Sequence, residues 1–194
     1  DGGWCLNGSK TFISNAPIAD VAIVFAMTDA SKGYMGGVTA FIVDRDTPGF
    51  AAGQVFEKLG LRTSQIGELV LQDVQVRDDA VLGEVGGGGA VFATAMDWER
   101  TLLVAGHVGT VERLLETCIA YARSRSQFGQ KIAKFQAVAH KIADMKIELE
   151  AARLLTYHAA WRLAQGRNAS LDASITKLFV SETLLRAALD TVQL

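Results

Sequence analysis

The first 85 residues carry short runs in which apolar residues alternate with polar ones or cluster, with turn signals between them. Such runs predict the strands of a small antiparallel β-sandwich or barrel. We expect these strands at residues 4–6, 10–13, 21–26, 38–43 and 68–76. Between the first two, Asn7-Gly8 predicts the type I′ turn of a β-hairpin, because both residue types accept positive φ.

After four consecutive glycines at 86–89, the apolar residues recur with a helical period. The pattern predicts helices over 90–124 and 135–165, with Gly166 as a stop signal, and a third helix that starts at Ser170 as its N-cap. The second helix is expected to carry Val138, Ile142, Met145, Leu149 and Ala152 along one face, and the third to carry the apolar residues Ile175, Leu178, Phe179, Leu185 and Leu189. Long helices with short connections predict an up-and-down bundle.

The predicted fold class is therefore α+β, with a small antiparallel β-domain over residues 1–85 and a helical bundle domain over 86–194. The glycine run between them lacks the surroundings of a P-loop or a dinucleotide fingerprint. We interpret it as a flexible hinge. Both ends of the sequence stop abruptly, the second of them within a helical pattern, which suggests a fragment.

Glu99 is the most informative polar position in the first long helix. The spacing places it in the middle of one apolar side, which is formed by Phe92, Ala95, Met96, Leu103 and Val104. An ionised carboxylate on a buried face costs several kcal/mol of desolvation, so such a group holds a proton more readily, as a general base must. The alternative is a structural carboxylate that Arg100 neutralises, and periodicity alone favours this second interpretation.

Composition narrows the function classes. The formal net charge of −2, from 19 basic and 21 acidic residues, argues against a nucleic-acid partner. Cys5 and Cys118 are far apart and match no metal spacing, which suits a reducing compartment. The three histidines likewise share no ligand spacing, so we expect no metal. No signal peptide opens the sequence, and no apolar run is long enough to span a membrane.

Several strings of residues occur together in one order. They are Thr11-Phe-Ile-Ser-Asn15, Phe41-Ile-Val43 with Thr47-Pro-Gly49, Leu59-Gly-Leu-Arg-Thr-Ser64 leading to residues 68–74, Met96-Asp-Trp-Glu-Arg100, and residues 123–132 with Phe135-Gln136. In this order and at these separations, the chain resembles the acyl-CoA dehydrogenase family of flavoproteins over nearly its whole length. The resemblance implies the middle β-domain and the start of the C-terminal helical domain of that family.

The resemblance also implies a reaction, the α,β-dehydrogenation of an acyl thioester. In that reaction a base removes the α-proton while the β-hydride passes to N5 of FAD. Glu99 matches the base position of the isovaleryl-type and long-chain-type enzymes, whereas other members place the base beyond the end of this sequence. Arg100 matches the family arginine next to the base and could line the acyl pocket, or it could instead pair with Glu99 or Asp97. Trp98 is either a packing residue or, beside Glu99, a wall of that pocket.

The cofactor positions follow from the same resemblance. Phe12 and Ile13 fall on the flavin-contacting strand, where phenylalanine replaces the usual tryptophan and so removes an N–H donor. Ser14 falls where a hydroxyl bonds near flavin N5. A second group matches the element that holds the diphosphate and adenosine of a neighbouring subunit's FAD, namely Arg125, Gln127, Phe128, Gln136 and Gln193. An arginine fork suits a diphosphate. These residues imply at least a homodimer, and a homotetramer is typical of the family.

The resemblance leaves some partners open. Coenzyme A and a carrier-protein phosphopantetheine arm present the same thioester, and the electron acceptor is either an electron-transfer flavoprotein or, in an oxidase, dioxygen. The expected compartment is the bacterial cytoplasm or the mitochondrial matrix. Two other interpretations are a non-catalytic interaction module that keeps the family bundle, and a helical bundle fused to an unrelated β-domain.

Overall fold

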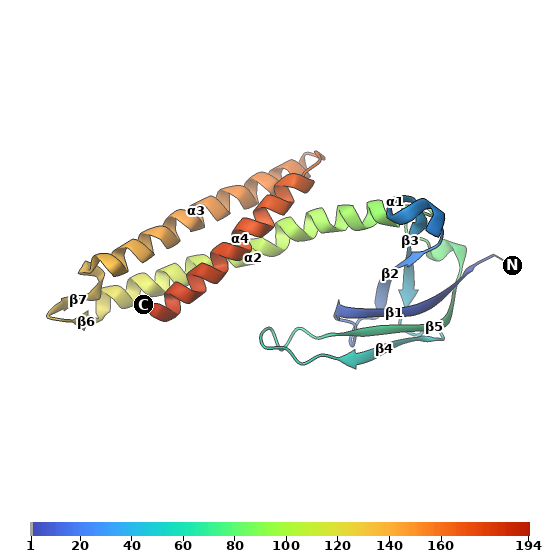
Figure 1. The fold of residues 1–194 in the computed structure, drawn as a ribbon, viewed down its shortest axis with the longest axis horizontal. Coiled ribbons are helices and arrows are strands. Elements are labelled where there is room, and N and C mark those ends of the chain that lie inside the picture. The colour runs from blue at the N-terminus through green and yellow to red at the C-terminus, as the bar shows by residue number, and fades with distance from the viewer. Residues whose placement is uncertain (1) are drawn as a thin grey trace. The chain divides into compact units, whose positions relative to one another are not determined.

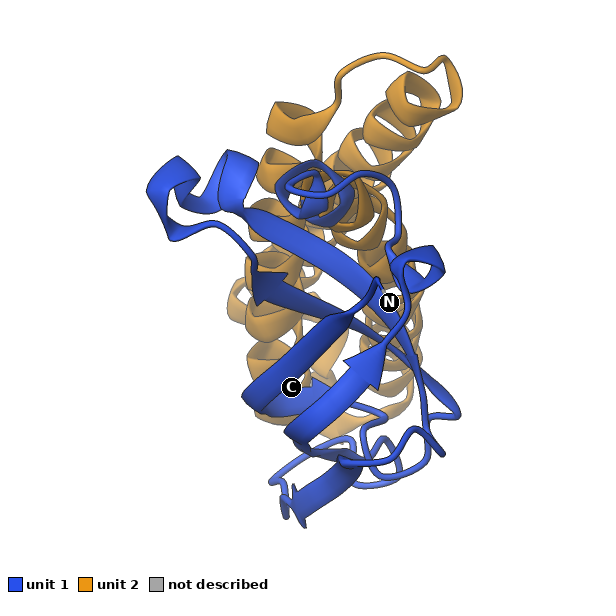
Figure 2. Cartoon of the chain, turned by 90° about the vertical axis from the view of Figure 1, so that its right-hand side faces the viewer, with its two compact units in different colours: residues 1–92 blue, residues 93–194 orange. Residues whose placement is uncertain are grey.

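The computed structural model describes residues 2–194. The chain forms two compact units, residues 1–92 and 93–194 (Figure 2). The first contains antiparallel sheets and the second is helical, so the predicted α+β class is confirmed (Figure 1). The elements of the first unit are β1 (Trp4–Ser14), β2 (Val21–Met27), η1 (Ala30–Lys32), α1 (Gly33–Gly37), β3 (Val38–Asp44), β4 (Phe50–Val55), β5 (Ile66–Val76) and η2 (Asp78–Ala80).

The strands of the first unit form two antiparallel sheets. One sheet has the order β1-β5-β4, and the other pairs β2 with β3. Alternate side chains of both sheets enter one core, as period-2 strands with one buried face require. The core consists of Leu6, Val24, Phe41, Val43, Leu71, Val74 and Val76.

The predicted hairpin at Asn7-Gly8 is wrong, because β1 runs unbroken through both residues and pairs with β5 along its length. A register shift between Leu6 and Gly8 takes up the irregularity. The Asn7 side chain accepts a hydrogen bond from the Asp73 backbone N–H at 2.8 Å and donates one to the Asp73 carboxylate at 3.0 Å. Asp73 itself has φ 51°. Pairing with a partner strand of equal length thus overrides a local turn signal, which here stabilises a bulge.

The glycine run is a site of close packing, so its interpretation as a flexible hinge is also wrong. Helix α2 (Gly88–Ser124) begins inside the run. A Cβ on Gly88 would lie 2.8 Å from the carbonyl oxygen of Val38 in β3, which leaves no room for any side chain. Gly86 has φ 82°, and its N–H donates to the Thr39 hydroxyl at 2.8 Å. Glycine is required here because the backbone approaches β3 closely.

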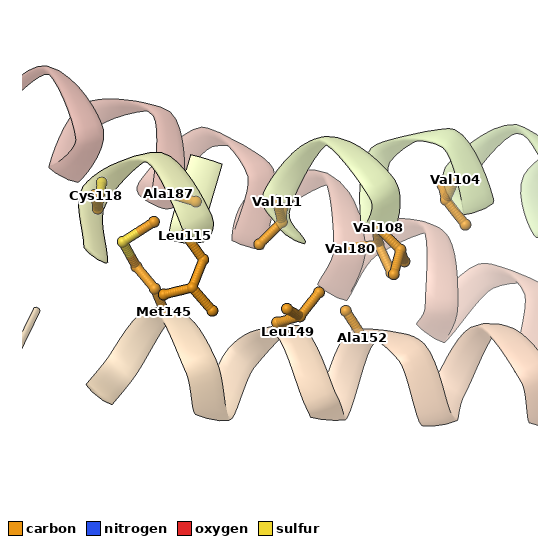
Figure 3. Packing of buried hydrophobic residues seen from close by; sticks show 10 residues of the cluster. All are labelled: Val104, Val108, Val111, Leu115, Cys118, Met145, Leu149, Ala152, Val180 and Ala187. Atoms are coloured by element: carbon orange, nitrogen blue, oxygen red, sulfur yellow. The ribbon is translucent and has the colours of Figure 1, made fainter. Parts of the chain in front are cut away.

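Three long helices form the second unit. After α2 come the short strands β6 (Ser126–Gln127) and β7 (Gln130–Lys131), then η3 (Ile132–Lys134), α3 (Gln136–Ala164) and α4 (Ser170–Gln193). Their shared core is shown in Figure 3 and consists of Val104, Val108, Val111, Leu115, Cys118, Met145, Leu149, Ala152, Val180 and Ala187. No helix within residues 2–194 combines the length and apolar character needed to cross a membrane.

The predicted apolar face is buried in α3, but in α4 only Phe179 of the predicted residues packs against the core. Helix α3 buries Met145, Leu149 and Ala152. Helix α4 instead buries its small and short side chains, which are Ala173, Thr176, Val180, Thr183 and Ala187. The larger aliphatic residues Ile175, Leu178, Leu185 and Leu189 are exposed. The N-cap of α4 is Ala169, and Ser170 is its first helical residue.

An ion-pair network joins α2 to α3 and makes the stability of the bundle depend on pH. Arg153 contacts Glu112 at 2.7 Å and Glu150 at 3.0 Å, and Glu150 also contacts Lys146 at 2.5 Å. The hydrogen bond from Lys146, followed by the nearby charges, lowers the pKa of Glu150 below its ordinary value of 4.5. A lowered carboxyl pKa stabilises the fold above the unfolded-state pKa, and this contribution disappears as the pH falls through the folded-state pKa.

We therefore expect Glu150→Gln to lower the melting temperature of the full-length protein slightly at pH 7, because the network loses its central charge. The difference from the wild-type protein should shrink as the pH falls below about 4.5, because the carboxyl group then gains its proton first in the unfolded chain. Calorimetry of both proteins over this pH range measures the difference in melting temperature. A difference in melting temperature that grows towards acid pH would contradict the lowered pKa of Glu150.

Candidate active site

Glu99 lies on an exposed side of α2, so the expected burial of this carboxylate is wrong for this chain. The buried stripe of the helix instead passes through Thr101, which is 0% exposed, and then through Val104 and Val108. At about 100° per residue, Glu99 points roughly 200° away from Thr101. The helical bundle therefore does not desolvate Glu99, and a base at this position needs cover from outside the bundle.

The surroundings of Glu99 are nevertheless apolar. Trp98, Leu102 and Leu103 are 46%, 53% and 61% exposed, and the last two follow Glu99 by three and four positions. Residues at these spacings share one helix face. An uncovered apolar face with a single carboxylate offers what an acyl chain and a general base require.

Arg100 does not neutralise Glu99. Within residues 2–194, neither side chain has an ion pair or hydrogen bond, and Arg100 is partly buried. Asp97, the other expected partner of Arg100, accepts a hydrogen bond from the Ser170 hydroxyl instead. The structural interpretation of Glu99 as a carboxylate paired with arginine thus has no contact to support it.

The three flavin-strand candidates lie at the end of β1. A register shift between Lys10 and Ile13 forms a bulge in the pairing with β5, and Phe12 occupies this bulge with φ 59°. Its ring is 71% exposed. Positive φ is unfavourable for a bulky residue, and such strain gathers at functional sites. Ile13 and the exposed Ser14 line a cavity of about 260 Å³ beside β2.

Phe56 is a neighbour of this strand that sequence reasoning missed. Its ring lies 4.9 Å from that of Phe12, centroid to centroid, at an angle of 38°. The residue follows β4 directly, and its N–H donates to the carbonyl oxygen of Ile66. Only the pairing of β4 with β5 brings it close, so no local motif could have indicated the contact. The ring supports Phe12 in its exposed position.

The hairpin formed by β6 and β7 carries the second group of candidates. Phe128 and Gly129 have φ 51° and 79°, as in a two-residue type I′ turn. Phenylalanine is an unusual residue for this turn, and its ring is 92% exposed at the tip. Arg125 precedes the hairpin and is exposed, and its guanidinium group has no polar partner within residues 2–194. Gln127 pairs with Gln130 in the hairpin.

Gln136 and Gln193 lie at the same end of the bundle as this hairpin. Gln136 is the first residue of α3, and Gln193 is the last residue of α4, which runs alongside α2 in the same direction (Figure 1). Glu99 is far from this end, because α2 separates it from Arg125 by about 40 Å at 1.5 Å per residue. The structure thus brings together the second group of candidates and keeps it apart from Glu99.

No three His, Cys, Asp or Glu side chains within residues 2–194 gather in a way that could hold a metal ion. His158 contacts Asp172 across the turn between α3 and α4, at 3.5 Å from Nδ1 to the carboxylate. Its ring also stacks on Trp161, with a centroid distance of 6.2 Å. This histidine serves the packing of the helices.

Comparisons with known proteins show which family this chain resembles over its length. The model of the acyl-CoA dehydrogenase middle domain matches residues 1–74, and that of the acyl-CoA dehydrogenase C-terminal domain matches residues 86–194. An L-prolyl-[peptidyl-carrier protein] dehydrogenase from a Serratia species is 43% identical over 193 residues, which cover 100% of this chain and 50% of the relative. The short-chain-specific acyl-CoA dehydrogenase of Megasphaera elsdenii is 44% identical over 194 residues, with the same coverage.

Solved structures show the same likeness. The prolyl acyl carrier protein oxidase AnaB superposes with a TM-score of 0.96 at 43% identity, over 100% of this chain and 51% of that one. Butyryl-CoA dehydrogenase from Megasphaera elsdenii gives a TM-score of 0.93 at 43% identity, over 98% and 50%. The chain spans about half the length of the curated relatives it matches. On these matches to both of its parts, the chain belongs to the acyl-CoA dehydrogenase family.

Proposed function

We propose that the protein containing this chain catalyses the FAD-dependent α,β-dehydrogenation of an acyl thioester. One observation carries the proposal: Glu99 stands free of Arg100 on an uncovered apolar face of α2. This placement suits a carboxylate that a bound substrate desolvates. Relatives whose names specify the dehydrogenation of carrier-protein and CoA thioesters match the whole chain at 43% and 44% identity, which supports the reaction class.

The residues present fit FAD. A guanidinium fork without a partner and an exposed aromatic ring lie together at Arg125 and Phe128, and they suit a diphosphate and an adenine ring. The strained turn at Phe128 supports a binding role, because this residue is 92% exposed and the bundle gains little buried area from its ring. Gln127, Gln136 and Gln193 add amide groups at the same end of the bundle. FAD, when bound, supplies the acceptor for the hydride that leaves the β-carbon.

The residues of the chain have separate roles in this proposal. Glu99 takes the proton from the α-carbon of the thioester, and a double bond forms between the α- and β-carbons as the hydride leaves. Trp98 and Arg100 flank the acyl chain. Ser14 places a hydroxyl donor beside the flavin, and Phe12 with Ile13 offers it an apolar contact. A donor at that position stabilises charge that develops during the transfer.

The distance of about 40 Å along α2 between Glu99 and Arg125 also bears on oligomeric state. One active site does not contain both residues of the same chain. We therefore propose that Arg125 and its neighbours hold the FAD of another subunit, so that the protein is at least a homodimer and, as is typical of the family, a homotetramer.

The acyl carrier and the electron acceptor are also proposals. The names of the relatives include both peptidyl-carrier-protein and CoA substrates, so either handle suits this chain. An electron-transfer flavoprotein is the proposed acceptor, because a relative that is 39% identical over 191 residues is named as a subunit of a caffeyl-CoA reductase-Etf complex. The name of AnaB makes dioxygen the alternative. A bacterial cytoplasm or a mitochondrial matrix suits these partners.

Anaerobic titration of the full-length protein tests the function. The purified protein should be yellow, and butyryl-CoA or an L-prolyl-carrier protein should bleach its oxidised flavin absorbance. Mass spectrometry should then find an acyl group that has lost two hydrogens. A protein that binds no flavin, or whose flavin spectrum changes with neither thioester, would support the non-catalytic module instead.

A further inference from the structure

A hydrogen bond joins α2 to α4 next to the proposed base. The Ser170 hydroxyl donates to the Asp97 carboxylate at 2.5 Å, across 73 positions of sequence. Asp97 is partly buried, and Ser170 is the first residue of α4. The carboxylate therefore lies at the N-terminal end of α4, where the helix dipole favours a negative charge. Charge-assisted bonds of this kind are short and strong.

The α4 side of this contact is firmly held. The Ser170 backbone N–H donates to the Asn168 side chain at 3.1 Å, and Arg162 of α3 donates to the Asn168 carbonyl at 2.8 Å. Arg162 also pairs with Asp172, in the first turn of α4, at 2.9 Å. These bonds attach the start of α4 to the end of α3, so Ser170 is a fixed point to which α2 is tied.

The contact sets which way Glu99 faces. Asp97 precedes Thr101 by four positions, so both lie on the α2 face that packs against the rest of the bundle. Thr101 is 0% exposed, but its hydroxyl has no hydrogen-bond partner within residues 2–194, so it constrains this turn by packing alone. At about 100° per residue, Glu99 points roughly 200° from Asp97, away from α4. The bond from Ser170 thus adds a directional constraint to the turn that carries Glu99, beside the packing of Thr101 and Val104.

We propose that Asp97 and Ser170 form a positioning pair for the base. The pair holds the first half of α2 at one rotation about its axis and one position along it, so that the Glu99 carboxylate lies next to the α-carbon of the substrate. This inference rests on the proposed function, because it needs Glu99 as the base. Neither residue of the pair touches the substrate, and both act through the backbone of α2.

Single substitutions test the pair in the full-length protein. Asp97→Ala and Ser170→Ala should each lower the rate of flavin reduction at saturating thioester by about 10- to 100-fold, since small misplacements of reacting groups have effects of this size. The thioester concentration that gives half the maximal rate should stay unchanged. Ser170→Thr keeps the hydroxyl group and should restore most of the rate.

The matched control is Arg186→Ala, which removes another interhelix contact. Arg186 of α4 pairs with Glu148 of α3 at 2.9 Å, away from the Asp97 turn. This variant should lose stability to heat but keep the rate measured well below the melting temperature. If Arg186→Ala slows flavin reduction as much as Asp97→Ala does, the effect comes from a general loss of rigidity in the bundle. The positioning role of Asp97 and Ser170 is then overturned.

A double variant separates the inference from the proposed function. If Asp97 acts through Glu99, adding Asp97→Ala to Glu99→Gln should lower the residual rate no further. If Asp97→Ala lowers the rate of the Glu99→Gln variant as much as it lowers the rate of the wild-type protein, the positioning role of Asp97 and Ser170 is overturned. If Glu99→Gln lowers the rate of flavin reduction but Asp97→Ala does not, only the positioning role of Asp97 and Ser170 is overturned. If Glu99→Gln leaves the rate unchanged, the proposed base is contradicted as well.

Discussion

Replacing Glu99 with glutamine should lower the rate of flavin reduction by an acyl thioester about 10²- to 10⁴-fold, the usual contribution of a general base. Glutamine keeps the size and shape of the side chain but cannot accept the α-proton. Binding of the thioester should therefore persist while the chemical step fails. Rapid mixing without oxygen, with flavin absorbance as the signal, measures thioester binding separately from the chemical step.

Glu116→Gln is the control for this experiment. Glu116 is an exposed carboxylate further along α2, beside Arg113 at 3.6 Å. The same chemical change at this position should leave the rate of flavin reduction unchanged. If Glu99→Gln bleaches as fast as the wild-type protein, the base lies outside the helix, and the segment beyond residue 194 becomes the place to look for it.

Removing the guanidinium group of Arg125 should weaken FAD binding about 10- to 100-fold, which corresponds to about 1.4–2.8 kcal/mol. This range matches the contribution of hydrogen bonds to a charged group. Arg125→Lys should recover only part of the affinity, because an ammonium group is a point charge without the planar fork. Titration of the apoprotein with FAD measures the dissociation constants of the wild-type protein, the Arg125→Ala variant and the Arg125→Lys variant.

Arg123→Ala provides the matched control, since Arg123 is an exposed arginine in the last turn of α2, before the hairpin. Its loss should change FAD affinity little beyond the general effect of one positive charge. Equal losses for the two variants would indicate a diffuse electrostatic effect. Unchanged affinity for Arg125→Ala would remove the hairpin from the cofactor site.

The helices were predictable because their signals are local. The expected range 135–165 differs by one residue at each end from α3, whose apolar period and stop glycine both lie within the segment. Asn7-Gly8 misled for the same reason. Its turn signal is local, whereas the pairing of β1 with β5 involves residues more than 50 positions apart. The sequence alone does not show that this pairing prevails.

The faces of the helices were harder to predict because two of them have two apolar sides. Helix α4 carries small residues on one side and large aliphatic residues on the other, and hydrophobicity alone favours the large ones. The bundle buries the small side, which lets the helices approach closely. The same ambiguity made the side of α2 that carries Glu99 look like its buried side, although residues on it such as Leu103 prove to be exposed.

The candidate site came mainly from family resemblance, which supplied Glu99, Phe12 and Arg125. The structure adds the contacts that hold them, such as the bond between Ser170 and Asp97 and the ring of Phe56 beside Phe12. These contacts join residues 73 and 44 positions apart, so periodicity and local motifs carry no trace of them. The resemblance named the candidate groups, and the structure was needed to find their neighbours.

The most direct test of the central claim is a crystal structure of the full-length protein with FAD and a thioester analogue that cannot react. The account predicts the Glu99 carboxylate within about 3–3.5 Å of the α-carbon, the range of a near-attack geometry, and screened from water. A Glu99 side chain in bulk solvent, with a carboxylate from another segment at the α-carbon, would contradict it.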